Sequence, residues 1–247
     1  MNSGDQQVNK ETQLEGMPQM QNGLPVGPLV DPSAARRPCR ITLRGRLVSI
    51  VPLDPAAHTE ALYEGTHGSD REKLWLYLGE RPFTDRAAFA AYLEKRSKSD
   101  DPLSFVIIDH ATKRATGHAS YMRIVPEHRV LEVGNIFYAP ILSRSAAGTE
   151  AMYLMARHVF EDLGYRRYEW KCDALNEPSR RAALRLGFSF EGIFRQHMIQ
   201  KGRSRDTAWY SMLDHEWLAR KARFEAWLRP DNFDAAGRQL TRLSQMD

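Results

Sequence analysis

Residues 131–160 read LEVGNIFYAPILSRSAAGTEAMYLMARHVF, and this stretch predicts the unit around which the fold is built. Glu132–Tyr138 is a β-prone run that ends at Pro140, because proline cannot donate a hydrogen bond to a neighbouring strand. Apolar residues then recur at the spacing of one buried helix face, namely Met152, Met155, Ala156, Val159, Phe160 and Leu163. The opposite face carries Tyr153 and Glu161, so the pattern predicts a strand followed by a helix with one exposed side.

The loop between this strand and helix, Ser143–Thr149, has almost no side-chain bulk beyond one arginine. Such a loop leaves the first N–H groups of the helix unpaired. Together with the helix dipole they form an anion site that suits a phosphate or diphosphate. The same residues also allow a plain N-terminal cap by Ser143 or Ser145, and spacing alone leaves both interpretations open. The loop lacks the Gly-Lys-Ser/Thr ending of a Walker loop and the three glycines of a dinucleotide fingerprint.

The composition limits the classes of function. Hydrophobic residues make up 42% and charged residues 27% of the 247 residues, as in globular proteins with a proper core. The net charge of +4 suits an anionic partner, but no long basic block is present, so we expect no nucleic-acid partner. Cys39 and Cys172 lie far apart and the histidines lack ligand spacing, so we expect neither a disulfide nor a metal site.

The sequence also suggests how the chain is divided. It shows neither a signal-peptide pattern nor an apolar run long enough to span a bilayer, so we expect no membrane contact and a cytoplasmic location. Residues 1–40 are rich in Gln, Asn, Gly and Pro, and most of them are expected to be disordered. Residues 41–213 are expected to form one domain, followed by a C-terminal helix and tail over residues 214–247.

Local patterns predict the remaining elements. Upstream they are, in chain order, a strand at Arg46–Leu53, helices at Ala56–Glu64 and Arg71–Leu78, a helix capped by Thr84, and antiparallel strands at Leu103–Asp109, Gly117–Val125 and Val130–Tyr138. Downstream they are a strand at Tyr165–Asp173, a short helix capped by Asn176 and ended by Gly187, strands at Phe188–Met198 and Thr207–Leu213 about a Lys201-Gly202 turn, and a helix from Asp214. Because the strand–helix–strand unit over residues 131–173 requires a parallel crossover, the fold class is α/β, with one mixed, mostly antiparallel sheet.

The segment TEAMYLMARHVFEDLGYRRYEWKCDALNEPSRRAALRLGFSFEG, residues 149–192, resembles the GCN5-related N-acetyltransferase superfamily. Within it, the chain is similar to the branch that includes the ribosomal-protein N-terminal acetyltransferases. The most specific part is Asn-x-x-Ser followed by a short helix and Gly-Phe, together with the spacing of Cys172 and Ser179. The resemblance covers roughly Arg46–Leu213.

This resemblance implies a cleft for acetyl-coenzyme A where two neighbouring strands splay apart, with helices on both faces of the sheet. The backbone of Ile136, Phe137 and Tyr138 would run beside the pantetheine arm, Asn176 would bond the donor, and Ser179 would lie near its sulfur. The diphosphate would be received by the loop residues Ser143, Arg144, Ser145, Ala146, Ala147, Gly148 and Thr149. The loop departs from the family pattern, with Ser143 at its first position and Ala146 in place of the first glycine. One of Arg144, Arg180, Arg181 and Arg185 would meet the 3′-phosphate.

The implied chemistry is direct attack of an amine on the thioester, which needs a base, donors for the oxyanion and an acid for the leaving thiolate. Ser179 is the candidate acid, although it also fits a first-turn hydroxyl with no catalytic role. The ribosomal branch carries a carboxylate where this chain has Met198. The base is therefore left open between Glu132, His197, Asp173, water and none.

The acceptor is expected to be a primary amine, either a protein N-terminus or a small molecule, and its identity stays open because acceptor pockets are built from variable loops. Residues 66–84 are expected to contribute to that pocket, with Trp75 and Tyr77 as lining or core. A homodimer is possible on this evidence. A module that binds acyl-coenzyme A without turnover is the alternative function, because of Met198.

Overall fold

The computed structural model describes residues 19–246, and the chain divides into two compact units, residues 1–33 and 34–247. In the first unit, β1 (Gln19–Gln21) and β2 (Leu24–Val26) form a hairpin. Its turn uses Asn22 and Gly23 at φ 52° and 78°, as a two-residue hairpin requires. Residues 1–18 of the expected tail lie outside the described residues.

The second unit begins before the expected domain boundary. The N–H groups of Ala35 and Arg36 donate to the carbonyls of Pro126 and Leu163, each at 3.0 Å, so this stretch runs along the unit rather than forming part of a free tail. Within residues 19–246, no helix is both long and apolar enough to cross a bilayer.

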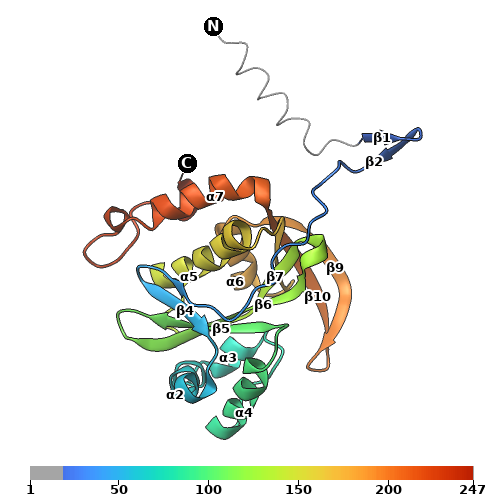
Figure 1. Cartoon of the computed structure of the whole chain (residues 1–247). Coiled ribbons are helices and arrows are strands. Elements are labelled where there is room, and N and C mark those ends of the chain that lie inside the picture. The colour runs from blue at the N-terminus through green and yellow to red at the C-terminus, as the bar shows by residue number, and fades with distance from the viewer. Residues whose placement is uncertain (1–18, 247) are drawn as a thin grey trace. The chain divides into compact units, whose positions relative to one another are not determined.

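The second unit is built on a sheet of eight strands, and this sheet is mixed, as the sequence predicts (Figure 1). Seven pairings join neighbouring strands, and only the one between β7 and β8 is parallel. In spatial order the strands are β3 (Leu43–Arg44), β4 (Val48–Pro52), β5 (Leu103–Asp109), β6 (Arg114–Val125), β7 (Val130–Tyr138), β8 (Arg167–Asp173), β10 (Arg203–Leu213) and β9 (Ser189–Gln200).

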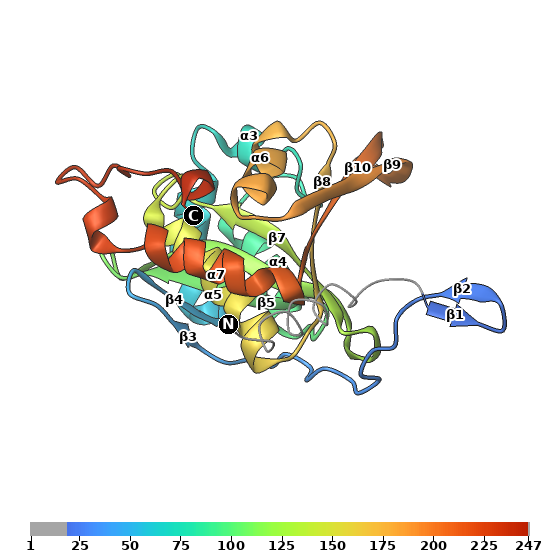
Figure 2. The same ribbon diagram turned by 90° about the horizontal axis from the view of Figure 1, so that it is seen from above.

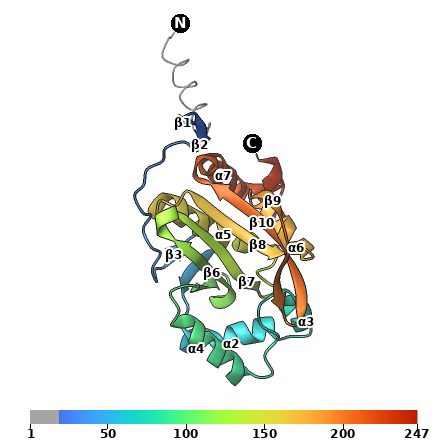
Figure 3. The ribbon, with the colours of Figure 1, turned by 90° about the vertical axis from the view of Figure 1, so that its right-hand side faces the viewer.

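Helices cover both faces of this sheet, as Figures 2 and 3 show. One face carries α2 (Pro55–Thr66), α3 (Arg71–Trp75) and α4 (Arg86–Ser97) over a cluster that includes Trp75, Phe89 and Phe137. The other face carries α5 (Ala146–Arg157), with its π-helical continuation His158–Asp162, and α7 (Asp214–Trp227). The short helix α6 (Glu177–Arg185) lies between β8 and β9 in the chain.

Three sequence predictions about these elements are wrong. The strand β3 was not expected, and Asp85 rather than Thr84 caps α4, because its carboxylate accepts from the N–H of Ala88 at 2.9 Å. The face of α5 expected to be exposed is buried: Tyr153 is 6% exposed. The reason is α7, whose Phe224 and Trp217 rings lie 5.6 and 6.1 Å from the ring of Tyr153.

Candidate active site

The parallel strands β7 and β8 form a fork. They pair at four consecutive positions, from Val130 with Arg167 to Val133 with Trp170. Beyond Val133 and Trp170 the two strands separate, whereas β8 stays paired with β10 on its other edge along its whole length. The separated part of β7 contains Ile136, Phe137 and Tyr138, so the structure places these residues along an opening in the sheet with backbone groups that β8 does not use.

A β-bulge lies just beyond the fork. The register between β6 and β7 shifts so that Asn135 and Ile136 both face Ala119, and Asn135 takes a φ of 51°. The carbonyl of Asn135 accepts from Nδ1 of His118 at 2.9 Å, and the His118 ring stacks on Phe137 with centroids 4.7 Å apart. Burial lowers the pKa of His118 to about 4, so this histidine is neutral at pH 7 and holds the bulge in place. No pattern in the sequence indicated this role for His118.

The loop before α5 has both features that its sequence allowed, a serine cap and N–H groups without partners. Ser145 is the cap: its hydroxyl oxygen accepts from the N–H of Gly148 at 2.9 Å. The N–H groups of Ser143, Ser145 and Thr149 are also used within the loop. Among the residues that the structure describes, no partner is found for the N–H groups of Arg144, Ala146 and Ala147. These three free donors at a helix N-terminus fit an anionic group such as a diphosphate.

Gly148 holds this loop against β7. A Cβ at this position would lie 2.7 Å from the carbonyl oxygen of Leu142 and 3.2 Å from the ring of Tyr138. The Tyr138 hydroxyl donates to the carbonyl of Gly148 at 3.3 Å, which ties strand and helix together. Any side chain at residue 148 would therefore move the loop backbone itself.

Asn176 and Ser179 lie at the start of α6. The Asn176 side-chain oxygen accepts from the N–H of Ser179 at 3.2 Å, which confirms the predicted cap. The Ser179 hydroxyl accepts from the indole N–H of Trp170 at 3.0 Å. Since Trp170 is the last residue of β8 paired with β7, this contact places Ser179 at the fork. The oxygen of the hydroxyl accepts from the indole, so its proton can be donated, and the Cys172 sulfur lies within hydrogen-bonding reach of it.

Glu132 lies beside the fork in a buried charged cluster. Its side chain is 7% exposed, and its Oε2 lies 3.0 Å from Nζ of Lys171. Lys171 also donates to Glu169 at 2.6 Å, and its Nζ lies 3.8 Å from the ring centroid of Trp209. Burial raises the pKa of Glu132, with Lys171 and Arg123 opposing that shift.

The two carboxyl groups that share Lys171 differ in proton affinity. Burial acts to raise the pKa of Glu169 as well, but hydrogen bonds from Lys171 and Arg167 lower it overall. Two carboxyl groups whose environments push their pKa values apart mark the one with the higher pKa as the better proton acceptor. The arrangement therefore favours Glu132 over Glu169 as a base.

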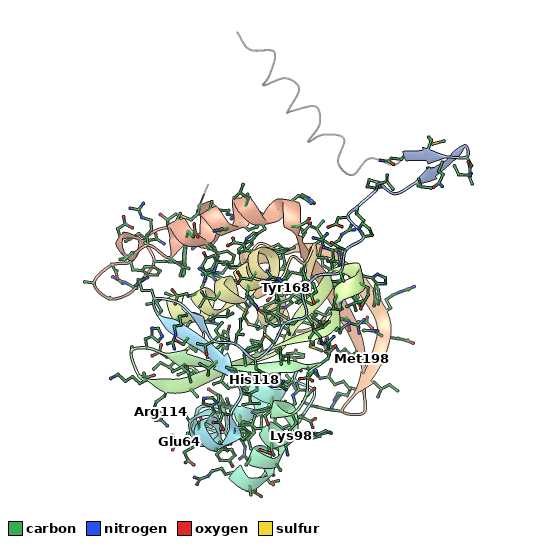
Figure 4. The ribbon with its side chains drawn as sticks, viewed as in Figure 1. Glu64, Lys98, Arg114, His118, Tyr168 and Met198 are labelled. Atoms are coloured by element: carbon green, nitrogen blue, oxygen red, sulfur yellow. The ribbon has the colours of Figure 1, made fainter. Side chains whose placement is uncertain are left out.

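The other candidate bases lie in less suitable places. Asp173 accepts from the N–H of Leu175 at 2.8 Å and so shapes the turn before α6. His197 is on β9, two strands from β8, with its Nδ1 2.9 Å from the hydroxyl of Thr207. Met198, at the position where the ribosomal branch has a carboxylate, is 40% exposed on this edge strand (Figure 4).

The four arginines considered for the 3′-phosphate are in different surroundings. Arg185 reaches the loop, where it donates to the hydroxyl of Thr149 at 3.1 Å and stacks 4.9 Å above Trp227. Nε of Arg180 donates to the Tyr210 hydroxyl at 3.2 Å. The side chain of Arg181 is 67% exposed and lies beside Glu177. Arg144 is exposed on the loop at a φ of 59°. In the described part of the chain, no group of three metal-ligand side chains is present.

Known proteins are similar to this chain in sequence and fold. A family model described as "Acetyltransferase (GNAT) domain" matches residues 48–189. A GCN5-related N-acetyltransferase from Brucella melitensis is similar in structure, with a TM-score of 0.85, 48% identity, and coverage of 87% of this chain and 97% of that one. The uncharacterized N-acetyltransferase YoaA of Bacillus subtilis is 31% identical over 124 residues, which are 50% of this chain and 67% of that protein.

The ribosomal branch is represented among the structural neighbours. An acetyl transferase from Salmonella typhimurium that modifies the N-terminal serine of ribosomal protein L7/L12 has a TM-score of 0.61 at 16% identity, covering 70% of this chain and 99% of that one. At that identity the likeness shows the fold alone. The match of the family model over more than half of the sequence is stronger evidence, and it shows that the chain belongs to the GNAT acetyltransferase family.

Proposed function

We propose that the protein is an N-acetyltransferase that moves an acetyl group from acetyl-coenzyme A to a primary amine by direct attack on the thioester. The observation that carries this proposal is the fork between β7 and β8, which has free N–H donors at one end and Ser179 and Glu132 at the other. Ala146 and Ala147 would hold the diphosphate, and Ile136–Tyr138 would pair with the pantetheine arm.

The residues at the fork suit the proton transfers of this reaction. A nitrogen–carbon bond forms and the carbon–sulfur bond breaks. Glu132 takes one proton from the ammonium, directly or through water, so that the free amine can attack. As the intermediate collapses, its nitrogen loses a second proton to solvent and Ser179 gives one to the sulfur. Ser179 then regains a proton from solvent and Glu132 releases its proton to solvent, so the reaction releases one proton in all.

The direct test is thiol release by the purified chain from acetyl-coenzyme A in the presence of a panel of primary amines. We expect amine-dependent thiol release, with an acetylated product of the matching mass. If no amine of the panel caused thiol release, the proposal would be contradicted. In that event, tight binding of coenzyme A without turnover would favour an acyl-coenzyme A-binding module, the function suggested by the exposed Met198.

Ser179→Ala should lower kcat by about 10²-fold, because it removes the proton donor for the thiolate, and should leave the KM for acetyl-coenzyme A nearly unchanged. Steady-state kinetics of thiol release measure both. Trp170→Phe removes only the indole N–H that orients the hydroxyl, and should lower kcat less. Equal kcat for the Ser179→Ala variant and the wild type would show that the hydroxyl is only structural.

Arg185→Gln should abolish the preference for coenzyme A over dephospho-coenzyme A, which we expect to be about tenfold from one charge-assisted hydrogen bond. The reason is the position of Arg185 against Thr149, at the start of α5. Calorimetric titration with the two compounds measures the preference. Arg181→Gln is the matched control, because Arg181 is on the same helix but faces solvent. An unchanged preference in Arg185→Gln would assign the 3′-phosphate elsewhere.

A further inference from the structure

A cavity of about 130 Å³ lies between α3, α4 and the separated part of β7. Its lining includes Trp75, Glu80, Tyr92, Arg96, Asn135 and Phe137. Two of these residues, Asn135 and Phe137, belong to the strand assigned above to the acyl donor. A space of this size suits a small acceptor, or the small end of a larger one.

The walls of the cavity are fixed by contacts on both sides. Trp75 is 1% exposed and its indole N–H donates to the carbonyl of Thr66 at 3.2 Å, so its ring has one position against Phe137. The turn between β9 and β10 holds the same wall from its other side, since Nζ of Lys201 donates to the carbonyl of Trp75 at 2.6 Å and Gln200 donates to that of Leu78 at 2.7 Å. Figure 3 shows the end of this hairpin close to α3. Within residues 66–84, Trp75, Leu78, Gly79 and Glu80 line the cavity, whereas the Tyr77 hydroxyl donates to the carbonyl of Leu175.

The charge inside the cavity is positive. The guanidinium of Arg96 lies 5.6 Å from the ring centroid of Tyr92, and its Nε is buried without a hydrogen-bond partner. None of the ion pairs found within residues 19–246 involves Arg96, and the one carboxylate of the lining, Glu80, is exposed. A buried donor without a partner is costly, and a ligand carboxylate that accepts from it removes that cost. Polyamines and aminoglycosides carry several positive charges, which this cavity would repel.

The uncharged side of the cavity, at Asn135, lies toward Glu132, the candidate base for the acceptor amine. The side-chain amide of Asn135 lies 3.7 Å from the sulfur of Met122, and Met122 is the cross-strand neighbour of Glu132. Gly134 lets the side chains of Met122 and Glu132 lie close to β7, because a Cβ there would lie 2.5 Å from the Met122 sulfur and 3.3 Å from Oε1 of Glu132. A nitrogen on the Asn135 side of the cavity is therefore directed toward Glu132 and the fork.

We propose that the acceptor is a small α-amino acid, bound with its carboxylate on Arg96, its apolar part on Trp75 and Phe137, and its amine toward the fork. This inference rests on the proposed N-acetyltransferase function. It distinguishes a free amino acid from a protein N-terminus, whose first residue has an amide carbonyl in place of the carboxylate, and from amines that lack an acidic group.

The test compares matched acceptors in the thiol-release assay: glycine, alanine, serine and threonine, each with its amide and with the amine that lacks the carboxyl group. We expect the best amino acid to exceed its amide and its amine in kcat/KM by about 10- to 100-fold, the effect of one hydrogen bond to a charged group. Arg96→Gln should remove this advantage through KM for the acceptor and leave KM for acetyl-coenzyme A unchanged. Lys95→Gln, the neighbouring exposed charge on α4, should change neither.

The outcomes separate this inference from the proposed function. Turnover of the amides or amines at the rate of the amino acids would overturn it while leaving the N-acetyltransferase function intact, and so would equal losses for all acceptors in Arg96→Gln. If no amine is turned over, titration of the amino acids into the protein loaded with coenzyme A decides the question. Binding that Arg96→Gln abolishes would support the cavity assignment, and absence of binding would overturn it.

Discussion

Glu132→Gln should lower kcat for amine acetylation by about 10²- to 10⁴-fold, the usual contribution of a general base. Glutamine fills the same space but cannot accept the proton, and Lys171 keeps Glu169 as a partner, so the fold should persist. Stopped-flow or steady-state thiol release measures the loss. Glu169→Gln is the matched control, because it also removes a carboxylate from Lys171 and should reduce kcat far less.

The pH dependence gives this prediction a second readout. The carboxyl group of Glu132 works as a base only when ionised, and burial raises its pKa above the usual value for glutamate. The kcat/KM of the wild type should therefore rise with pH through that raised pKa. Glu132→Gln should keep only the rise at alkaline pH that comes from ionisation of the amine itself. An unchanged acidic limb in the variant would show that the proton is taken by another group.

Ala146→Pro should weaken coenzyme A binding by about 10- to 100-fold, because it removes one of the free N–H donors assigned to the diphosphate. Proline is well tolerated here, since residue 146 is the first residue of α5 and its N–H has no partner inside the protein. Ser145 already has the extended backbone, φ −97° and ψ 163°, that a following proline requires. Calorimetric titration with coenzyme A measures the change.

The control for this variant is Arg86→Pro. Residue 86 is the first residue of α4, after a capping Asp85 with extended backbone, and it is remote from the loop. We expect both proline variants to keep the Tm of the wild type and only Ala146→Pro to lose affinity. If Ala146→Pro binds coenzyme A as tightly as the wild type, the N–H of residue 146 does not contact the diphosphate.

The sequence predicts local features of this fold well because they depend on neighbouring residues. Strand β5 and strand β7 have the predicted ends, Asn176 caps α6, and Gly187 leaves α6 at a φ of 93°. Periodicity and capping chemistry are sufficient for such features. Such local rules fail where two neighbouring residues are both good caps. Thr84 and Asp85 could each cap α4, and the path of the chain before the helix selects Asp85.

Features that depend on distant residues were not predictable in this way. The burial of Tyr153 depends on α7, more than sixty residues further along the chain. The position of the fork depends on which residues of β7 and β8 pair, which no pattern in either strand encodes. The contact of Trp170 with Ser179 and the ion pair of Lys171 with Glu132 follow from that register. Buried Trp170 and Cys172 alternate with Glu169 and Lys171 in the sequence, a pattern that indicates a polar face for Lys171 but not its position beside Glu132.

The most direct measurement is a crystal structure of the chain with coenzyme A. The account predicts diphosphate oxygens within hydrogen-bond distance of the N–H groups of Ala146 and Ala147, and the sulfur in the opening beyond Val133 and Trp170, close to the Ser179 hydroxyl. Coenzyme A bound elsewhere, or a sulfur remote from the opening between β7 and β8, would contradict it.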